Sequence, residues 1–528
     1  MPTLLLTTLL LLGIEQHPDV LVVCPQEFRA ALQPWVAHRV EQGYRVAFVS
    51  SEQSADEIRD DARRAATMAE LKSVVLVGDW DPRAFADERL RARCTPAVAV
   101  KAKVNVLWGS EPEIATDNWY VDLDDDQLPD VPIGRLSVDT PQQLVTIVDK
   151  ILRYERERKP GTWRRRLNFV AGVGGFGALA DSVLETATKK FLTELIPPAY
   201  EISMTYGSWR SPYCPDPRQF HTATLDRLNE GSLFWVYIGH GQRRFLDRVR
   251  TPSGFHHIFD TDDVRKLHLA GGAPIAVFLA CYTGSFDEVR DCLGEELVRS
   301  EQGPVAAFCG SRITMPYAMA VMGNELMDQY FVQKRATLGE AVLHAKRQMA
   351  RTLTTEEQAA NPNRHLLDAL AAAISPAKDM LDEERLEHVQ LFNLLGDPLL
   401  RLNHAQDLEV VLAKDIEAGQ ELRIGGTSPI DGNCTVELVC RRDRTKRRTI
   451  QRQRYDPRDD ALAAYDDTYA NANDRVWTTQ TIAITSGEFE TTLPVPAEAR
   501  GASYVRVFVE SPTEHALGAA KVFVRQPK

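Results

Sequence analysis

Short runs of β-branched residues alternate with helix-like stretches along the first third of the chain. The expected strands lie at residues 20–24, 45–49, 73–78 and 131–136. Helix-like stretches at 26–42 and 54–70 separate the first three, and this alternation indicates a parallel sheet with helices on both faces. A further helix opens at Pro141 and ends at Lys159-Pro160-Gly161, because proline suits a first turn and Pro-Gly ends a helix. We therefore place a domain boundary near residue 160.

The same alternation restarts after this boundary. Strands are expected at residues 167–171, 234–238, 275–280 and 304–309, with helical stretches between them. From about residue 404 short alternating strands follow one another with turn residues and without helical stretches, which is typical of an Ig-like β-sandwich. The predicted fold class is α/β: two doubly wound subdomains at 18–160 and 161–403, then an all-β Ig-like sandwich at 404–528.

Charge and composition argue against several classes of protein. The formal net charge of −12 in a chain of 528 residues argues against a nucleic-acid partner. Residues 1–17 are apolar without a basic start, so they predict either a degenerate secretion signal or a strand of the first domain. Ten apolar residues are too few for a transmembrane anchor. The compartment stays open between secreted or periplasmic and cytoplasmic.

Two of the predicted strands end in reactive side chains. His240 follows the apolar run 234–238 between two glycines, and Cys281 follows the run 275–280. Neighbouring parallel strands share their carboxyl edge, where ligands bind. A thiolate attacks carbonyl groups, and an imidazole exchanges protons near neutral pH, so the pair predicts thiol catalysis. The backbone N–H groups of Gly241 and Cys281 are the expected oxyanion donors. A packed cysteine without catalytic function is the alternative.

The sequence around these residues resembles that of the caspase-like cysteine peptidases, and specifically that of the gingipain family. The similar motifs are Gly239-His-Gly241, Ala280-Cys-Tyr-Thr-Gly-Ser-Phe-Asp287, Asp291-Cys-Leu-Gly-Glu-Glu-Leu297, Gly303-Pro-Val-Ala-Ala307, Asn393-Leu-Leu-Gly-Asp-Pro398 and the segment from Asp122 to Leu136. The resemblance covers about residues 18–403. It implies a caspase-like fold of two subdomains and peptide-bond hydrolysis through a thioester, with His240 as the catalytic histidine and Cys281 as the nucleophile. A polypeptide substrate is implied, and no cofactor is required.

The resemblance also suggests how a substrate is held. Arg-specific gingipains bind the basic P1 side chain with an acidic residue, and Asp181 is the candidate by alignment of its helix. Its alternative is a helix N-terminal acid favoured by the dipole. Tyr317 matches an aromatic residue of the same pocket, where it would stack on a cation, and core packing is its alternative. The loops near Gly174 and Trp209 do not match the family clearly, so the P1 preference stays open.

An acidic segment has the spacing of a calcium-binding loop. Asp122, Asp124, Asp126 and Asp130 occupy positions 1, 3, 5 and 9 of such a loop. Gln127 replaces the glycine expected at position 6, and no glutamate stands at position 12. The segment predicts either a structural Ca²⁺ site or a solvated acidic turn.

Two other functions compete with the peptidase hypothesis. Residues 172–177 match the G-x-G-x-x-G pattern after a strand, which predicts a dinucleotide-binding domain. That pattern also needs an acidic residue at the end of the next strand, and residues 205–208 provide none. A non-catalytic adhesion or scaffold protein led by the β-sandwich is the third hypothesis, and the intact histidine and cysteine argue against it.

Overall fold

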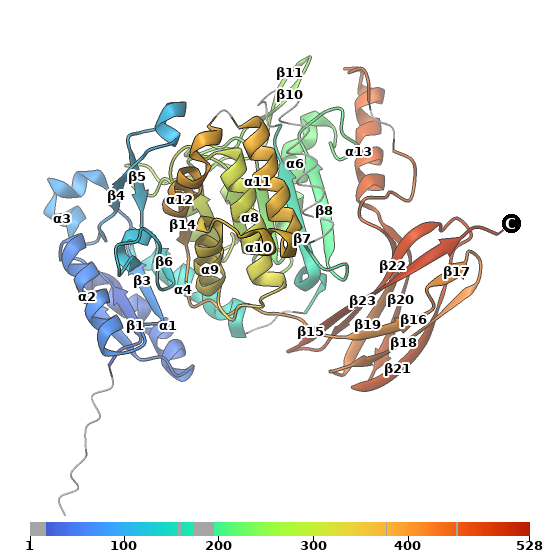
Figure 1. Ribbon diagram of the computed structural model, residues 1–528, viewed down its shortest axis with the longest axis horizontal. Coiled ribbons are helices and arrows are strands. Elements are labelled where there is room, and N and C mark those ends of the chain that lie inside the picture. The colour runs from blue at the N-terminus through green and yellow to red at the C-terminus, as the bar shows by residue number, and fades with distance from the viewer. Residues whose placement is uncertain (1–16, 157–159, 174–194, 376, 450–451, 528) are drawn as a thin grey trace, which may run out of the picture.

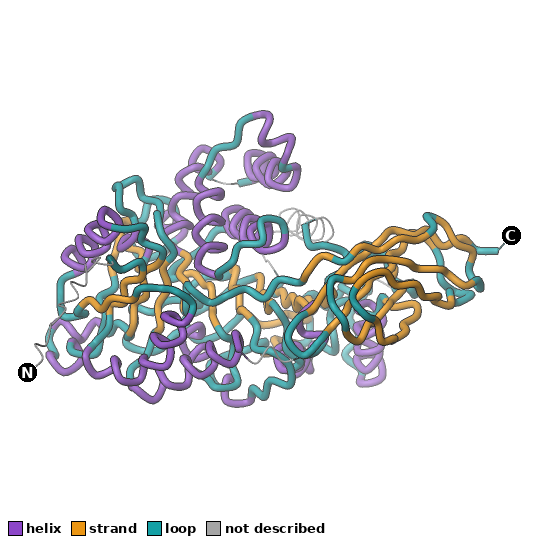
Figure 2. The backbone as a smooth tube through the Cα atoms, turned by 90° about the horizontal axis from the view of Figure 1, so that it is seen from below, coloured by secondary structure: helices purple, strands orange, loops and turns teal. Residues whose placement is uncertain are grey.

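The computed structural model describes residues 17–156, 160–173, 195–375, 377–449 and 452–527. An α/β part occupies the first three quarters of the chain, and a β-rich part follows it (Figure 1). In Figure 2 the strands of the α/β part lie between helices, as the alternation of the sequence predicts.

A single ten-stranded sheet runs through the whole α/β part, in the order β2-β1-β3-β6-β14-β13-β12-β9-β7-β8. Its N-terminal half contains β1 (Val20–Val23), β2 (Val46–Val49), β3 (Ser73–Val77) and β6 (Ile133–Leu136). Its C-terminal half contains β7 (Arg166–Ala171), β8 (Glu201–Tyr206), β9 (Phe234–Ile238), β12 (Ile275–Leu279) and β13 (Ala306–Gly310). The two predicted doubly wound units therefore share one sheet.

Strand β14 (Phe392–Leu395) joins the two halves. It pairs parallel with β6 and antiparallel with β13, so the strands of the two halves run in opposite directions. The carboxyl end of β14 is anchored by Asp397, which is buried and accepts hydrogen bonds from Trp35 Nε1 at 2.5 Å and from the Arg39 guanidinium of α1 (Arg29–Glu41). The Gly-Asp-Pro motif at this point thus has a structural function.

Helices cover both faces of the sheet (Figure 2). The helices beside the N-terminal half are α1, α2 (Ala55–Met68), α3 (Glu88–Arg91) and α4 (Pro141–Arg156). Those of the C-terminal half are α6 (Phe220–Asn229), α7 (Leu293–Arg299), α8 (Pro316–Phe331), α9 (Leu338–Ala350), α10 (Thr355–Ala360), α11 (Pro362–Ile374) and α12 (Leu381–Leu391). Two hairpins project from these layers, β4 (Val98–Lys101) with β5 (Glu113–Thr116), and β10 (Arg248–Thr251) with β11 (Gly254–His257).

The C-terminal part is β-rich, as predicted. One sheet contains β15 (Gln406–Asp407), β17 (Asp415–Glu417), β19 (Gly432–Cys440), β20 (Val476–Ile484), β22 (Gly501–Glu510) and β23 (His515–Arg525). The other contains β16 (Glu409–Leu412), β18 (Glu421–Ser428) and β21 (Gly487–Pro494). A separate apolar core, which includes Ile424, Val436 and Val507, is formed by strands from both sheets.

The expectation that this part lacks helices is wrong, because α13 (Asp459–Asn473) interrupts the strands. The helix packs beside β8, the edge strand of the large sheet, and Asn473 bonds both backbone groups of Met204 at 2.8 and 3.0 Å. Tyr469 also bonds Thr205 at 2.7 Å. Unpaired edge strands promote aggregation, and α13 covers this one. These tertiary contacts stabilise a helix whose own apolar pattern is weak.

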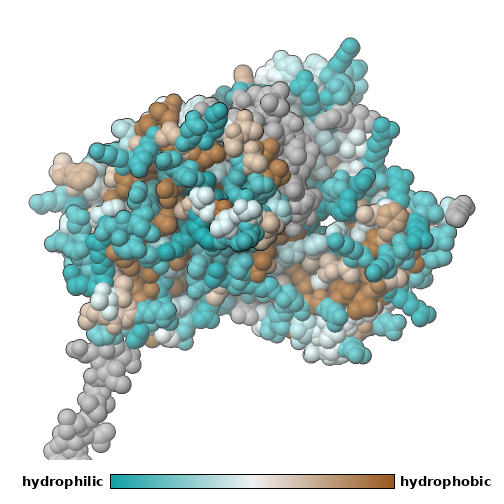
Figure 3. Space-filling model, in the orientation of Figure 1, coloured by the Kyte–Doolittle hydropathy of each residue, from teal (hydrophilic) through white to brown (hydrophobic). Residues whose placement is uncertain are grey.

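Hydrophilic residues cover most of the face drawn in Figure 3. Among the described residues, no helix has the length and apolar character needed to cross a membrane.

Candidate functional site

Three neighbouring parallel strands end at one edge of the sheet, and each is followed by a turn that carries a polar side chain or a thiol. Strands β9 and β12 pair in register from Phe234↔Ile275 to Ile238↔Leu279, and β13 is the next strand. His240 follows β9, Cys281 follows β12, and the segment that follows β13 leads to Thr314. The structure therefore brings the sequence-predicted histidine and cysteine to adjacent turns.

The glycines around His240 allow a close approach of these turns. Gly239 has φ +153°, a conformation that side-chain-bearing residues rarely adopt. A Cβ atom on Gly241 would lie 2.6 Å from the carbonyl oxygen of Cys281. The backbone carbonyl of His240 accepts hydrogen bonds from the Tyr237 hydroxyl at 2.9 Å and from the Asp247 N–H at 3.1 Å. The histidine turn is thus fixed through its backbone, and it lies close against the cysteine turn at Gly241.

Cys281 differs from the other cysteines in its exposure. All eight cysteines are free, and seven are buried, whereas Cys281 is partly exposed. Burial raises the pKa of Cys24 to about 12 and that of Cys434 to about 11, and it also raises the pKa of Cys94, Cys214, Cys292, Cys309 and Cys440. A thiolate is the nucleophilic form. Cys281 is therefore the thiol best placed to react with a substrate.

Thr314 contacts the Cys281 sulfur, and the sequence analysis missed it. Its backbone N–H donates to Sγ at 3.3 Å, and its hydroxyl lies 3.6 Å from Sγ and 3.0 Å from Met319 Sδ. Thr314 lies just before α8, whose N-terminus carries partial positive charge. A hydrogen-bond donor and a helix N-terminus therefore both lie beside the sulfur. The Thr314-Met-Pro sequence indicates that a helix starts here, and this pattern could have drawn attention to Thr314.

A buried histidine holds the same loop in place. The Met315 N–H donates to His388 Nε2 at 2.7 Å, and His388 Nδ1–H donates to the Glu384 carbonyl of α12 at 2.7 Å. Burial lowers the pKa of His388 to about 4, which keeps the imidazole neutral and able to accept. The backbone next to Thr314 is thus positioned by a residue distant in sequence.

A charged cluster links the turns of His240 and Cys281 to the N-terminal half. Tyr282, directly after Cys281, has φ +58°, an uncommon conformation for a bulky residue. Its hydroxyl donates to Glu111 at 2.9 Å, and the Arg243 guanidinium lies 4.6 Å from its ring. Arg243, three residues after His240, donates to Glu111 at 2.7 Å. Glu111 therefore connects the histidine turn with the cysteine turn. Its hydrogen bond to Tyr282 stabilises the uncommon backbone conformation of that residue.

Both predicted oxyanion donors are available. Gly241 pairs with Leu246 in a short bridge whose two hydrogen bonds use the His240 carbonyl and the Gln242 N–H. Among the described residues, neither the Gly241 N–H nor the Cys281 N–H makes a hydrogen bond. Two unpaired donors beside a partly exposed thiol can stabilise a negatively charged carbonyl oxygen.

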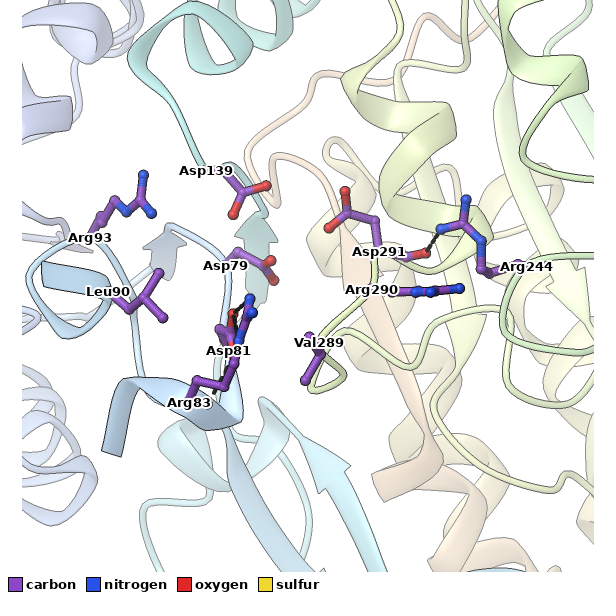
Figure 4. Close-up of a pocket in the computed structure, with 10 residues that line it drawn as sticks. All are labelled: Asp79, Asp81, Arg83, Leu90, Arg93, Asp139, Arg244, Val289, Arg290 and Asp291. Atoms are coloured by element: carbon purple, nitrogen blue, oxygen red, sulfur yellow. Dashed lines mark hydrogen bonds and ion pairs between the residues drawn. The ribbon is translucent and has the colours of Figure 1, made fainter. Parts of the chain in front are cut away.

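A cavity of about 500 Å³ lies between the loops after β3 and β6 and the segments that follow His240 and Cys281. Figure 4 shows Asp79 and Asp139 on one side and Asp291 and Arg244 on the other. The buried guanidinium of Arg299 pairs with Asp139, Asp291 and Asp79 at 2.8, 2.7 and 3.3 Å. Acidic and basic groups thus largely pair with one another here, and the lining includes neither catalytic candidate.

The structure describes one of the two predicted substrate-binding residues. Asp181 lies outside the described residues. Tyr317 is in the first turn of α8 and is 9% exposed. Its hydroxyl donates to Asp368 at 2.7 Å and accepts from Arg385 at 2.8 Å. This placement matches the core-packing alternative, and a function in substrate binding stays a prediction.

Three of the four predicted calcium ligands converge. Carboxylate oxygens of Asp122, Asp124 and Asp130 lie within 4.8 Å of one another, and Asp126 is not part of this group. Gln127 has φ +71°, so it adopts the left-handed conformation that glycine supplies at position 6 of a calcium loop. Arg59 pairs with Asp122 at 3.2 Å. Binding of Ca²⁺ stays a prediction.

The glycine-rich segment falls mostly outside the described residues, which end at residue 173 and resume at 195. Gly172 itself donates its N–H to the Ile238 carbonyl at 2.9 Å, beside the strand that carries His240.

Comparison with known proteins finds relatives of this chain. Lys-gingipain W83 of Porphyromonas gingivalis is 25% identical over 298 residues, which cover 55% of this chain and 15% of that protein. Gingipain R2 of the same species is 22% identical over 332 residues, covering 61% of this chain and 40% of that protein. The chain thus spans less than half the length of these curated relatives.

Two solved structures have the same fold. The complex of the pro- and mature domains of Porphyromonas gingivalis RgpB matches with a TM-score of 0.52 and 16% identity, over 96% of this chain and 100% of that one. A structure described only as a protease matches with a TM-score of 0.54 and 14% identity, over 95% and 97%. The fold is therefore a gingipain-like α/β fold with a C-terminal β-rich part.

Residues 14–403 match the family described as Peptidase family C25. The chain belongs to this family of cysteine-type endopeptidases and is distantly related to the Lys- and Arg-gingipains.

Proposed function

We propose that this chain is a cysteine endopeptidase in which Cys281 is the nucleophile and His240 the general acid and base. The observation that carries the proposal is the placement of a single partly exposed thiol at the edge where β9 and β12 end side by side. Family membership supports it, and the Thr314 N–H places a hydrogen-bond donor beside the sulfur.

The chemistry follows from these positions. The Cys281 thiolate attacks the scissile carbonyl carbon, and the carbonyl oxygen becomes negative between the N–H groups of Gly241 and Cys281. The His240 imidazolium gives its proton to the leaving amine as the C–N bond breaks. A water molecule, deprotonated by His240, then attacks the thioester, and the peptide acid leaves with regeneration of the thiolate.

A basic P1 preference is the finer part of the proposal, and it rests on resemblance. Asp181 is the residue that matches the acidic P1-binding position of the Arg-specific gingipains. A carboxylate there would hold a guanidinium by paired, charge-assisted hydrogen bonds. Replacement of Asp181 by Asn is expected to reduce hydrolysis of Arg substrates far more than that of neutral substrates. An equal reduction for both would reject the P1 assignment.

Alkylation tests the nucleophile directly. Iodoacetamide added to the native protein is expected to add one adduct, at Cys281, and to abolish cleavage of fluorogenic peptides. The Cys281→Ala variant should be inactive with an unchanged circular dichroism spectrum. Cys440→Ala, which replaces a buried thiol of the sandwich, serves as the matched control and should keep activity. Cleavage by the Cys281→Ala protein would show that the nucleophile lies elsewhere.

A further inference from the structure

Two histidines and an aspartate meet outside the candidate peptidase site. His221 is in the first turn of α6, His257 ends β11, and Asp263 begins a short 3₁₀ helix (Asp263–Lys266). One potential ligand atom from each lies within 4.8 Å of the other two. The hairpin of β10 and β11 projects from the molecule near α6 (Figure 1). We infer that these three residues form a binding site for a divalent transition-metal ion of the Zn²⁺ type.

The His221 imidazole is oriented as a metal ligand. Its Nδ1 lies 3.0 Å from the Ile258 carbonyl, to which it donates as N–H. This bond leaves the lone pair on Nε2, and Nε2 lies 3.3 Å from Asp263 Oδ1. Metal-binding histidines generally donate their second ring nitrogen to a carbonyl or carboxylate in this way, which fixes the tautomer and the ring.

The other two ligands complete a compact, accessible set. His257 Nε2 lies 2.7 Å from Asp263 Oδ2, and the two imidazole rings lie 4.7 Å apart. The Asp263 side chain is 2% exposed, whereas those of His221 and His257 are 21% and 39% exposed. A buried carboxylate beneath two partly exposed imidazoles gives an ion a path from solvent.

A further carboxylate lies next to His257, outside the group of three ligand atoms that converge. Asp260 Oδ2 is 3.6 Å from His257 Nε2, and its carboxylate is partly exposed. Two imidazole nitrogens and one carboxylate oxygen, completed by water, suit tetrahedral Zn²⁺, whereas Ca²⁺ and Mg²⁺ prefer oxygen ligands alone. The ion would join the β10–β11 hairpin to α6.

Lys266 is the competing cation. Its Nζ pairs with Asp263 Oδ1 at 2.8 Å, and its side chain is 58% exposed. Only the ammonium of this pair is exposed, so a divalent ion that displaces it supplies the positive charge that the buried Asp263 carboxylate requires. The alternative is a hydrogen-bonded His–Asp–Lys cluster that binds no metal. The metal proposal does not depend on the peptidase assignment.

Calorimetric titration of chelator-treated full-length protein with ZnCl₂ tests the inference. We expect one high-affinity Zn²⁺ per chain and a rise in melting temperature, both lost in His221→Ala and in His257→Ala. His256→Ala is the matched control, because His256 neighbours His257 on the opposite face of β11, and it should bind as the unchanged protein does. Circular dichroism of each variant checks that it is folded.

Cobalt distinguishes this site from the exposed thiol. Co²⁺ bound by nitrogen and oxygen ligands gives visible d–d bands without the sulfur-to-metal charge-transfer band that Cys281 would produce. A d–d spectrum that disappears in His257→Ala supports the inference. Absence of binding, a charge-transfer band, or binding unchanged in both histidine variants would overturn it.

Discussion

Protonation of His388 should destabilise the protein in acid by an amount that the structure defines. Burial lowers the pKa of this imidazole from 6.5 to about 4. At about 1.4 kcal/mol per pKa unit, the shift corresponds to about 3 kcal/mol. Between these two pH values the unfolded chain binds a proton that the native protein does not, so the free energy of unfolding falls as the pH falls.

A second buried group must be separated from this effect. Burial raises the pKa of the Glu384 carboxyl to about 7. A raised carboxyl pKa gives a stability contribution that is present below pH 4.5 and lost as the pH rises to about 7, which opposes the effect of His388. The prediction therefore concerns the difference between the protein and its His388→Gln variant, because Glu384 contributes to both.

The His388→Gln variant keeps an acceptor for the Met315 N–H and removes the group that takes up a proton. Urea unfolding followed by tryptophan fluorescence at pH 7, 6, 5 and 4 measures both proteins. The unchanged protein should lose about 3 kcal/mol relative to His388→Gln between pH 7 and pH 4. His365→Gln, which replaces an exposed histidine of α11, is the control and should follow the unchanged protein. Parallel curves for His388→Gln and the unchanged protein would refute the assignment of a buried, neutral imidazole.

Three further predictions concern the site and the acidic loop. Thr314→Val should lower kcat/KM about tenfold, because its hydroxyl lies 3.6 Å from Cys281 Sγ and a hydrogen bond to a charged group contributes about 1.5 kcal/mol; unchanged peptide hydrolysis would contradict a function of this hydroxyl at the sulfur. Gly241→Ala should strongly reduce activity, since its Cβ would lie 2.6 Å from the Cys281 carbonyl oxygen, and a fully active variant would show that the two turns separate easily. If the acidic loop binds Ca²⁺, CaCl₂ should raise the melting temperature of the protein but not that of Asp124→Asn; equal shifts would place any calcium effect elsewhere.

Much of the fold was accessible from local sequence patterns. Short apolar runs predicted β9 and β12, and the glycines around His240 marked a turn, because burial and backbone conformation at these positions depend on neighbouring residues. The same patterns did not show that β14 joins two halves with opposite strand directions. A strand of four apolar residues carries no information about its partners.

The sequence by itself determined that a histidine and a cysteine follow buried strands, because each strand is encoded in a few adjacent residues. Tertiary structure alone decided what surrounds them. Thr314 and Glu111 reach the turns of His240 and Cys281 from separate segments, His388 supports the loop of Thr314 from another, and His221 lies far along the chain from the His257–Asp263 segment that it meets. Contacts between distant segments depend on how helices and strands pack, and no periodicity within one segment records that packing.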